Sequence, residues 1–195
     1  MTRFLLTSIV SLFLLTPPAF AESDSSSKAI ATFGGGCLWC MEPPVDKHDG
    51  VVRTISGFSG GHVANPSYKQ VVRGNTGHTE VVQITYDPSK ISYQQLLQVY
   101  WKNVDPLDKG GQFCDRGWSY RPVIFTHNEE QQKLAEASRS ELDVNGTIAV
   151  PVESYSSFYA AEDYHQDYYL KNPVRYKFYR YNCGRDKRLQ QVWGE

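Results

Sequence analysis

The segment Lys28-Ala-Ile-Ala-Thr-Phe-Gly-Gly-Gly-Cys-Leu-Trp-Cys40 decides how the fold begins. Residues 28–33 are mostly apolar and predict a short β-strand. Residues 34–36 are three glycines, which let the backbone turn tightly and end the strand. Cys37 follows the turn and is expected to begin a short helix, which the prolines at positions 43 and 44 limit. The segment therefore predicts a strand, a turn and a helix that begins at a cysteine.

Further along the chain, strands and helices alternate. The clearest strand covers residues 78–86, and Ser92 with Gln95 forms a capping box that begins a helix ending before Pro106. Other strands are expected at residues 50–58, 121–126 and 148–152, other helices at 128–143, 162–172 and 185–193, and long loops at 57–75 and 105–118. Because no strict strand–helix–strand repeat is present, we predict an α+β fold, a two-layer sandwich of a mixed or antiparallel sheet with flanking helices.

Residues 1–21 have the three-part plan of a secretory signal peptide. Arg3 supplies a positive charge, an apolar run follows, and Ala19-Phe20-Ala21 is an A-x-A cleavage site. The apolar run is shorter than the ~20 residues that span a bilayer, which disfavours the alternative of an uncleaved anchor. We expect an exported, periplasmic protein that is soluble after cleavage. Residues 22–28 would form a flexible leader and residues 29–195 a single catalytic domain.

The composition excludes several classes of function. The chain has 20 basic and 21 acidic residues, so its formal net charge is −1. It carries no basic stripe for nucleic acid and no polybasic patch for a membrane surface. Because no apolar helix face is evident, we expect a monomer. Four cysteines remain after export, which is typical of structural disulfides in an oxidising compartment, although a domain of this size does not require them.

Cys37 is placed for reactivity. The N-terminus of a helix offers unpaired N–H groups and partial positive charge, so the pKa of Cys37 is expected to lie well below ~8.5. The alternative is a small buried residue that packs the turn. Cys37 and Cys40 also form a C-x-x-C pair, which is typical of thioredoxin-like sites. Zinc would need a second pair, and Cys114 and Cys183 are isolated in the sequence, so no metal is predicted.

Glu80 is a candidate proton donor. It lies at the start of the clearest strand and is followed by the apolar Val81 and Val82. Burial there would raise the pKa of its carboxyl group and make it an acid near neutral pH. A solvated carboxylate at the edge of the strand is the alternative.

Seven short motifs follow one another along the chain: Gly36-Cys37-Leu38-Trp39-Cys40, Gly57-Phe58-Ser59-Gly60-Gly61, Asn65-Pro66-Ser67-Tyr68, Gly77-His78-Thr79-Glu80, Gly110-Gly111-Gln112-Phe113-Cys114-Asp115-Arg116-Gly117, Tyr120-Arg121 and Ala161-Glu162-Asp163-Tyr164-His165-Gln166-Asp167. In order and spacing they resemble the A-type peptide methionine sulfoxide reductases. Each motif alone is weak, but together they extend over nearly the whole chain after the leader.

The resemblance implies roles in catalysis for four residues. Cys37 matches the thiolate that attacks the sulfoxide sulfur. Glu80 matches the acid that protonates the oxygen, which is a poor leaving group until it gains a proton. Tyr68 and Tyr120 match two tyrosines that hydrogen-bond this oxygen as it gains charge.

The resemblance also implies a substrate site and a fold. Trp39 matches an aromatic wall for the substrate methyl group, Leu38 stands where phenylalanine is usual, and Asp115 matches a polar group that lines the site. His165 lies in a shared motif and is expected to have a structural role. A ferredoxin-like core and the absence of any cofactor are implied as well.

After the attack, the resemblance implies a sulfenic acid on Cys37 and the release of methionine. A second thiol condenses with the sulfenic acid, and thioredoxin or a periplasmic equivalent reduces the resulting disulfide. We assign the resolving role to Cys183, because related enzymes often take this thiol from a mobile C-terminal tail, with Cys114 and Cys40 as alternatives. The A type reduces the S epimer of methionine sulfoxide, free or in proteins.

Two other functions remain as alternatives. The chain would be a general thiol–disulfide oxidoreductase if Cys37 and Cys40 formed its redox pair. It would be a secreted domain without enzymatic activity if its four cysteines formed two structural bridges. Stereoselective turnover of a blocked methionine sulfoxide distinguishes all three functions.

Overall fold

The computed structural model describes residues 27–194. The expected signal peptide, residues 1–21, and most of the expected leader, residues 22–28, lie outside this range. No helix within the described range is long and apolar enough to cross a membrane.

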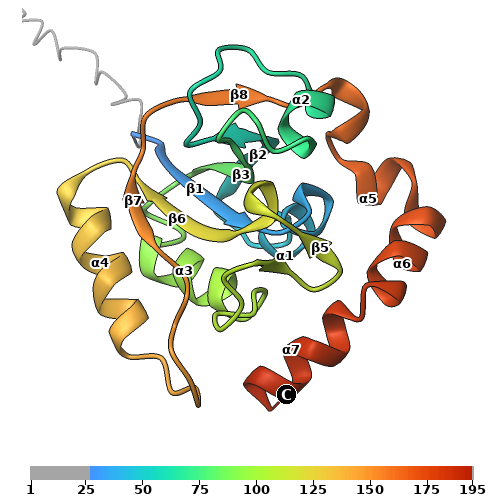
Figure 1. Ribbon diagram of the computed structural model, residues 1–195. Coiled ribbons are helices and arrows are strands. Elements are labelled where there is room, and N and C mark those ends of the chain that lie inside the picture. The colour runs from blue at the N-terminus through green and yellow to red at the C-terminus, as the bar shows by residue number, and fades with distance from the viewer. Residues whose placement is uncertain (1–26, 195) are drawn as a thin grey trace, which may run out of the picture.

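One curled sheet forms the centre of the molecule (Figure 1). Within residues 27–194 it has six strands in the order β7-β6-β1-β3-β2-β8, and neighbours are antiparallel except for β6 and β7. A separate ribbon consists of β4 and β5. The strands are β1 (Ala29–Gly35), β2 (Val51–Ser59), β3 (Thr79–Tyr86), β4 (Gly111–Gln112), β5 (Asp115–Arg116), β6 (Pro122–Thr126), β7 (Val152–Ser154) and β8 (Phe158–Ala160).

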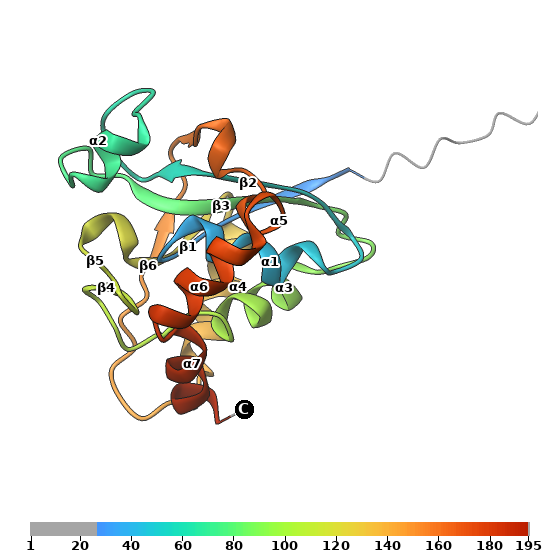
Figure 2. The same cartoon turned by 90° about the vertical axis from the view of Figure 1, so that its right-hand side faces the viewer.

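Helices cover one face of the sheet and one side of the molecule. Figure 2 shows α1, α3 and α4 beneath the sheet. In Figure 1, α5 and α6 descend along the right-hand side, and α7 continues to the bottom of the molecule. The α-helices are α1 (Glu42–Asp46), α2 (Tyr68–Val72), α3 (Tyr93–Trp101), α4 (Glu129–Ser140), α5 (Tyr168–Lys171), α6 (Pro173–Asn182) and α7 (Arg185–Trp193). The short 3-10 helices are η1 (Leu38–Cys40), η2 (Trp118–Tyr120) and η3 (Asp163–His165).

The main hydrophobic core lies between the sheet and α3. Alternate residues of β3, Val82 and Ile84, face this core and pack with Leu96 and Tyr100 of α3. Val81 faces the other side of the sheet, where it forms a smaller cluster with residues of β6. This alternation is the period-2 pattern that predicted the strand.

The α+β class, with a mixed sheet and flanking helices, is confirmed. The capping box of Ser92 and Gln95 is also present, with both of its hydrogen bonds. These features depend on side chains that lie close together in the sequence, so local patterns were sufficient to find them.

Several expected boundaries are wrong. The loop expected at residues 57–75 contains α2, which a second capping box of Ser67 and Gln70 begins. The loop at 105–118 contains the β4–β5 ribbon, and the helix expected at 162–172 is reduced to η3 and α5. The helix α6 was not expected at all. It begins at Pro173, and proline fits this position because the first N–H of a helix has no partner within the helix.

Candidate active site

Cys37 lies at the turn that joins β1 to η1. Gly36 makes this turn with a φ of +85°, and an added Cβ would lie only 2.7 Å from Cβ of Gln112. Glycine is the residue that tolerates both the positive φ and the close approach. The predicted strand, turn and helix are therefore present, and Cys37 immediately precedes the helix.

Cys37 and Cys40 are free thiols, and their side chains are only 7% and 1% exposed. Burial raises the pKa of Cys37, and its hydrogen bond with Cys40 raises that pKa further. The same hydrogen bond lowers the pKa of Cys40 to about 6, and the charges of Arg185 and Arg180 add to this effect. The hydrogen bond therefore couples the two thiols, and they lose their protons as a pair rather than independently.

The expectation of a lowered pKa for Cys37 is thus wrong. The helix η1 has only three residues, so it supplies little of the partial positive charge of a longer helix. Burial removes the water that would stabilise a thiolate. Glu80 and Asp115 also face this thiol, and their negative charge raises its pKa.

Glu80 lies on β3 opposite Phe58 of β2, and it is 1% exposed. Its Oε2 accepts a hydrogen bond of 3.0 Å from the backbone N–H of Leu38, the residue after Cys37. Its Oε1 is buried and has no hydrogen-bond partner among residues 27–194. Burial raises the pKa of Glu80 to about 8. The carboxyl group is therefore protonated at neutral pH. Glu80 is the buried acid that was expected, and not a solvated carboxylate at the edge of the strand.

Two phenol groups lie beside this carboxyl. Tyr68 is the first residue of α2, and Tyr120 is the last residue of η2. Their hydroxyl groups hydrogen-bond each other. Burial raises the pKa of both, and the negative charge of Glu80 raises it further. Both phenols therefore keep their protons and can act as hydrogen-bond donors.

Trp39 forms an aromatic wall next to the cysteines. Its ring stacks on Tyr168 of α5, with the centroids 3.8 Å apart, and its Nε1–H donates to Nδ1 of His165 at 2.9 Å. His165 is buried and holds the indole in place, which agrees with a structural role. Leu38 is also buried and packs against Trp39 and Tyr68.

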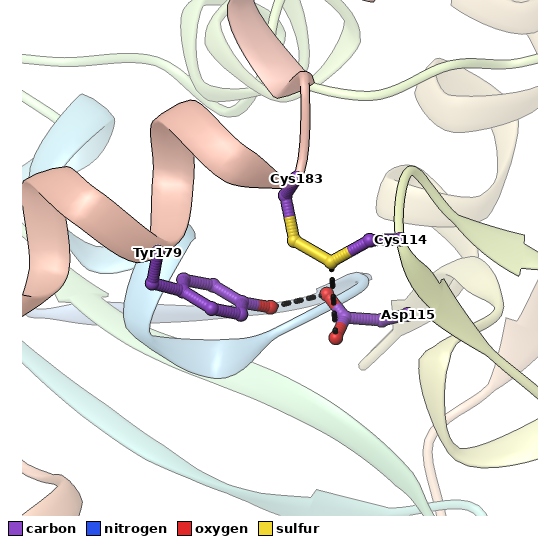
Figure 3. Close-up of a disulfide and its surroundings, with 4 residues drawn as sticks. All are labelled: Cys114, Asp115, Tyr179 and Cys183. Atoms are coloured by element: carbon purple, nitrogen blue, oxygen red, sulfur yellow. Dashed lines mark hydrogen bonds between the residues drawn. A yellow bond between two sulfur atoms is a disulfide. The ribbon is translucent and has the colours of Figure 1, made fainter.

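Cys114 and Cys183 form a disulfide (Figure 3), and both line the same groove as Trp39. Cys114 lies between β4 and β5, and Cys183 directly follows α6. The sulfur of Cys183 is therefore not on a free tail, because the disulfide ties the end of α6 to the β4–β5 ribbon. Since Cys37 and Cys40 are not bonded to each other, the arrangement of two structural bridges is not present.

Tyr179 connects the free thiols with the disulfide. Its hydroxyl donates a hydrogen bond to Asp115 (Figure 3), and it also hydrogen-bonds Cys37. Asp115 Oδ1 lies 3.9 Å from the sulfur of Cys114. Burial raises the pKa of both Asp115 and Tyr179. Asp115 therefore lies between the Cys37 thiol and the disulfide, within one connected set of polar groups.

The site joins a buried thiol, a protonated carboxyl group and two phenol donors. The model of the family described as peptide methionine sulfoxide reductase matches residues 29–195. The chain belongs to the peptide methionine sulfoxide reductase family. It is accordingly an oxidoreductase that reduces methionine sulfoxide to methionine.

Individual reductases of this family are similar to the chain over most of its length. The peptide methionine sulfoxide reductase MsrA of Bacillus licheniformis is 49% identical over 174 residues, which are 87% of this chain and 96% of that protein. The MsrA of Listeria monocytogenes is 49% identical over 167 residues, 84% of this chain and 94% of the relative. Both identities are high enough to carry the fold and the reaction.

Solved structures of reductases are similar as well. The reduced form of Mxr1 from Saccharomyces cerevisiae is 31% identical with a TM-score of 0.69, covering 77% of this chain and 89% of that one. Methionine sulfoxide reductase A of Corynebacterium diphtheriae is 30% identical with a TM-score of 0.66, and the match covers 77% of this chain and 78% of that one. The alternative of a general thiol–disulfide oxidoreductase is disfavoured, because the matching family model and these relatives are methionine sulfoxide reductases.

Sequence reasoning missed two residues of this reductase site, Tyr179 and Arg185. Arg185 is 1% exposed, and its Nη2 donates hydrogen bonds to the carbonyl groups of Gly35 at 3.1 Å and Asn103 at 2.6 Å. Its guanidinium also lies 4.4 Å from the ring centroid of Phe113. Arg185 therefore ties the chain just after Cys183 to the turn before the nucleophile candidate. No local pattern marks a tyrosine or an arginine for such contacts.

Proposed function

We propose that this reductase acts on the S epimer of methionine sulfoxide, free or in proteins, with Cys37 as its nucleophile. The observation that carries the proposal is the protonated carboxyl of Glu80, which is held against the residue that follows Cys37. A sulfoxide oxygen leaves only after it gains a proton. A buried acid next to a free thiol supplies both groups that the reaction needs.

The first step begins in the thiol pair. The proton of Cys37 passes along the hydrogen bond to Cys40, which leaves the thiolate on Cys37. This thiolate attacks the sulfoxide sulfur, Glu80 donates its proton to the oxygen, and the hydroxyl moves to the sulfur of Cys37. Methionine leaves, and Cys37 becomes a sulfenic acid. Tyr68 and Tyr120 hydrogen-bond the oxygen while its negative charge develops.

Three residues hold the substrate in this proposal. Trp39, fixed by its stacking on Tyr168 and its bond to His165, forms one wall for the methyl group. Leu38, which packs with Trp39 and Tyr68, is proposed to form the aliphatic part of the methyl site. Asp115 lines the polar side of the site next to Tyr179.

Cys183 is proposed to resolve the sulfenic acid. Its thiol condenses with Cys37, water leaves, and a Cys37–Cys183 disulfide forms. Cys114 then attacks the sulfur of Cys183, which releases Cys37 as a thiol and forms the Cys114–Cys183 disulfide. The pairing of these two cysteines beside Asp115 and Tyr179 supports the last disulfide of this sequence. Cys114 is the alternative first partner of Cys37. Cys40 is disfavoured in this role because it is buried.

Thioredoxin or an equivalent periplasmic dithiol donor is proposed to reduce the Cys114–Cys183 disulfide. The signal sequence expected at residues 1–21 supports export to the periplasm, where the protein would work as a monomer. Such a reductase would repair methionine residues oxidised in proteins of the cell envelope.

Separate S and R epimers of acetylated methionine sulfoxide test this proposal. The reduced enzyme without a donor should release about two methionines from the S epimer, one per attack by Cys37 before and after the Cys114–Cys183 disulfide forms, and none from the R epimer. Equal release from both epimers would contradict the proposed specificity. Release of no methionine from either would contradict the assigned chemistry.

A further inference from the structure

The helix α6 presents apolar side chains to the solvent. Val174, Phe178 and Tyr181 are 81%, 68% and 83% exposed. Their spacing of four and three residues places them on one face of the helix, which we call the outer face of α6. No apolar helix face was expected from the sequence, so the outer face of α6 corrects that expectation. Contiguous exposed apolar patches of this kind mark interaction sites more often than scattered single side chains do.

The outer face is not needed to hold α6 in place. Tyr176 and Tyr179 lie on the opposite face, where they pack with Cys37 and Cys40 and with other aromatic residues. The disulfide of Cys183 ties the end of the helix to the β4–β5 ribbon. The exposed side chains are therefore free to contact another molecule.

A groove of about 330 Å³ lies next to the outer face and contains the Cys114–Cys183 disulfide. Phe178 lines this groove and also belongs to the outer face, so the two surfaces are continuous. A space of this size takes a few side chains of a partner rather than a whole domain. A protein that inserts a loop there must rest the remainder of its contact surface on the neighbouring helix.

The charge of this surface selects the kind of partner. Arg175 and Lys177 flank the outer face on its two sides, and neither forms an ion pair with another described residue. No acidic residue occurs between Tyr168 and Asn182. Basic side chains around an apolar centre complement a partner with an apolar centre and an acidic rim.

We propose that the outer face of α6, with Arg175 and Lys177, is the docking surface for the protein that reduces the Cys114–Cys183 disulfide. The partner is a thioredoxin-like dithiol protein whose thiols lie in an apolar surface with an acidic rim. This inference rests on the proposed function, in which that disulfide is the one to be reduced.

The exchange at this surface transfers two electrons. A partner thiolate attacks the exposed sulfur of Cys114, a mixed disulfide forms, and Cys183 leaves as a thiolate that takes up a proton. The second partner thiol then attacks the partner's own sulfur in the mixed disulfide. Cys114 leaves as a thiol, and the partner retains the disulfide.

The double variant Val174→Asp/Tyr181→Asp tests the surface, because neither residue lines the groove. Turnover is measured with a thioredoxin, recycled by thioredoxin reductase and NADPH, and separately with dithiothreitol. The kcat/KM for thioredoxin should fall at least about tenfold, as for the loss of a central interface residue, whereas the dithiothreitol rate should be unchanged. The matched control Val52→Asp, at a position on β2 that is 48% exposed, should keep both rates.

A second double variant, Arg175→Glu/Lys177→Glu, tests the charge. The kcat/KM of the unaltered enzyme for thioredoxin should fall as the ionic strength rises, because salt screens the attraction between opposite charges. The variant should have a lower kcat/KM at low salt and a weaker dependence on salt. An identical salt dependence in both enzymes would contradict the role of the two basic residues.

Four outcomes would overturn the docking surface. The first is an unchanged kcat/KM for thioredoxin in the Val174→Asp/Tyr181→Asp variant, and the second is an equal fall in its rate with dithiothreitol. The third is a fall in rate that occurs only with oxidised protein substrates. The fourth is an unaltered enzyme that forms a dimer and a variant that does not. The second would assign the face to folding or chemistry, the third to substrate binding, and the fourth to self-association. An unaltered enzyme that is inactive with dithiothreitol would instead contradict the proposed function.

Discussion

The two cysteine pairs of this reductase differ in their access to solvent. Cys37 and Cys40 are free and buried, whereas Cys114 is exposed and bonded to Cys183. Tyr179 contacts Cys37 directly and reaches the disulfide through Asp115. Sulfoxide chemistry needs a dry site where a carboxyl keeps its proton, and thiol–disulfide exchange needs a sulfur that a protein can reach. The protein meets both requirements because the buried thiols and the exposed disulfide lie in separate regions.

The largest expected effect separates the members of the buried pair. Cys37→Ser should lower the rate of methionine release in a single turnover at least about a thousandfold, because a serine hydroxyl is a far weaker nucleophile at neutral pH. Cys40→Ser should retain the release and lower the pKa of Cys37, since Cys40 raises that pKa. Rapid quenching with enzyme in excess measures the release, and its dependence on pH reports the pKa of Cys37. Substantial release by the Cys37→Ser variant would exclude this nucleophile.

The next effect concerns the exposed pair. Cys183→Ser and Cys114→Ser should each release about one methionine per enzyme without a donor, rather than the two expected from the unaltered enzyme. Neither variant should sustain turnover with thioredoxin, because the disulfide that the donor reduces is missing. Steady-state rates near normal in the Cys183→Ser variant would move the resolving role to Cys114.

A smaller effect is expected at the carboxyl of the buried site. Glu80→Gln should lower the single-turnover rate by about a hundredfold near pH 7, within the usual contribution of a general acid. Glu80 loses its proton as the pH rises through about 8. The single-turnover rates of the variant and the unaltered enzyme should therefore become more similar above that pH. The pH profile of both enzymes checks this, and a constant ratio across the profile would count against the role.

The same pKa predicts a change in stability with pH. The pKa of Glu80 is about 8 in the folded protein against an ordinary value of 4.5, so the folded state holds the proton more tightly. Its contribution is complete below about pH 4.5 and is lost as the pH rises to about 8. The Glu80→Gln variant does not lose this contribution. Its Tm should therefore rise relative to the Tm of the unaltered enzyme as the pH increases over this range. Thermal unfolding at several pH values measures the difference.

The smallest expected effect links the two regions through Arg185. Arg185→Met removes the hydrogen bonds to Gly35 and Asn103 and the positive charge that lowers the pKa of Cys40. The pKa of the thiol pair should rise and the rate at neutral pH should fall several-fold. Arg185→Lys, which keeps the charge, should restore the pH profile. Ultraviolet absorbance of the thiolate against pH measures this, and a loss of Tm without a shifted profile would indicate a purely structural role.

Local patterns predicted much of the fold. The alternation in β3 and the capping box of α3 depend on residues within one element, so both could be found from the sequence. The helix α6 could not, because its apolar side chains face the solvent and give no core-facing pattern. Its inner face is held by aromatic contacts and a disulfide that come from distant parts of the chain.

By itself the sequence determined the strand, turn and helix around Cys37, the α+β class and, through the order of its motifs, the resemblance to the reductase family. Each of these depends on neighbouring residues or on residue identity. Only the tertiary structure decided that the two buried thiols lose their protons as a pair, that Glu80 keeps its proton, and that Cys114 pairs with Cys183 across 69 residues. Protonation and pairing depend on burial and on groups from distant segments, and these come together only when the chain folds.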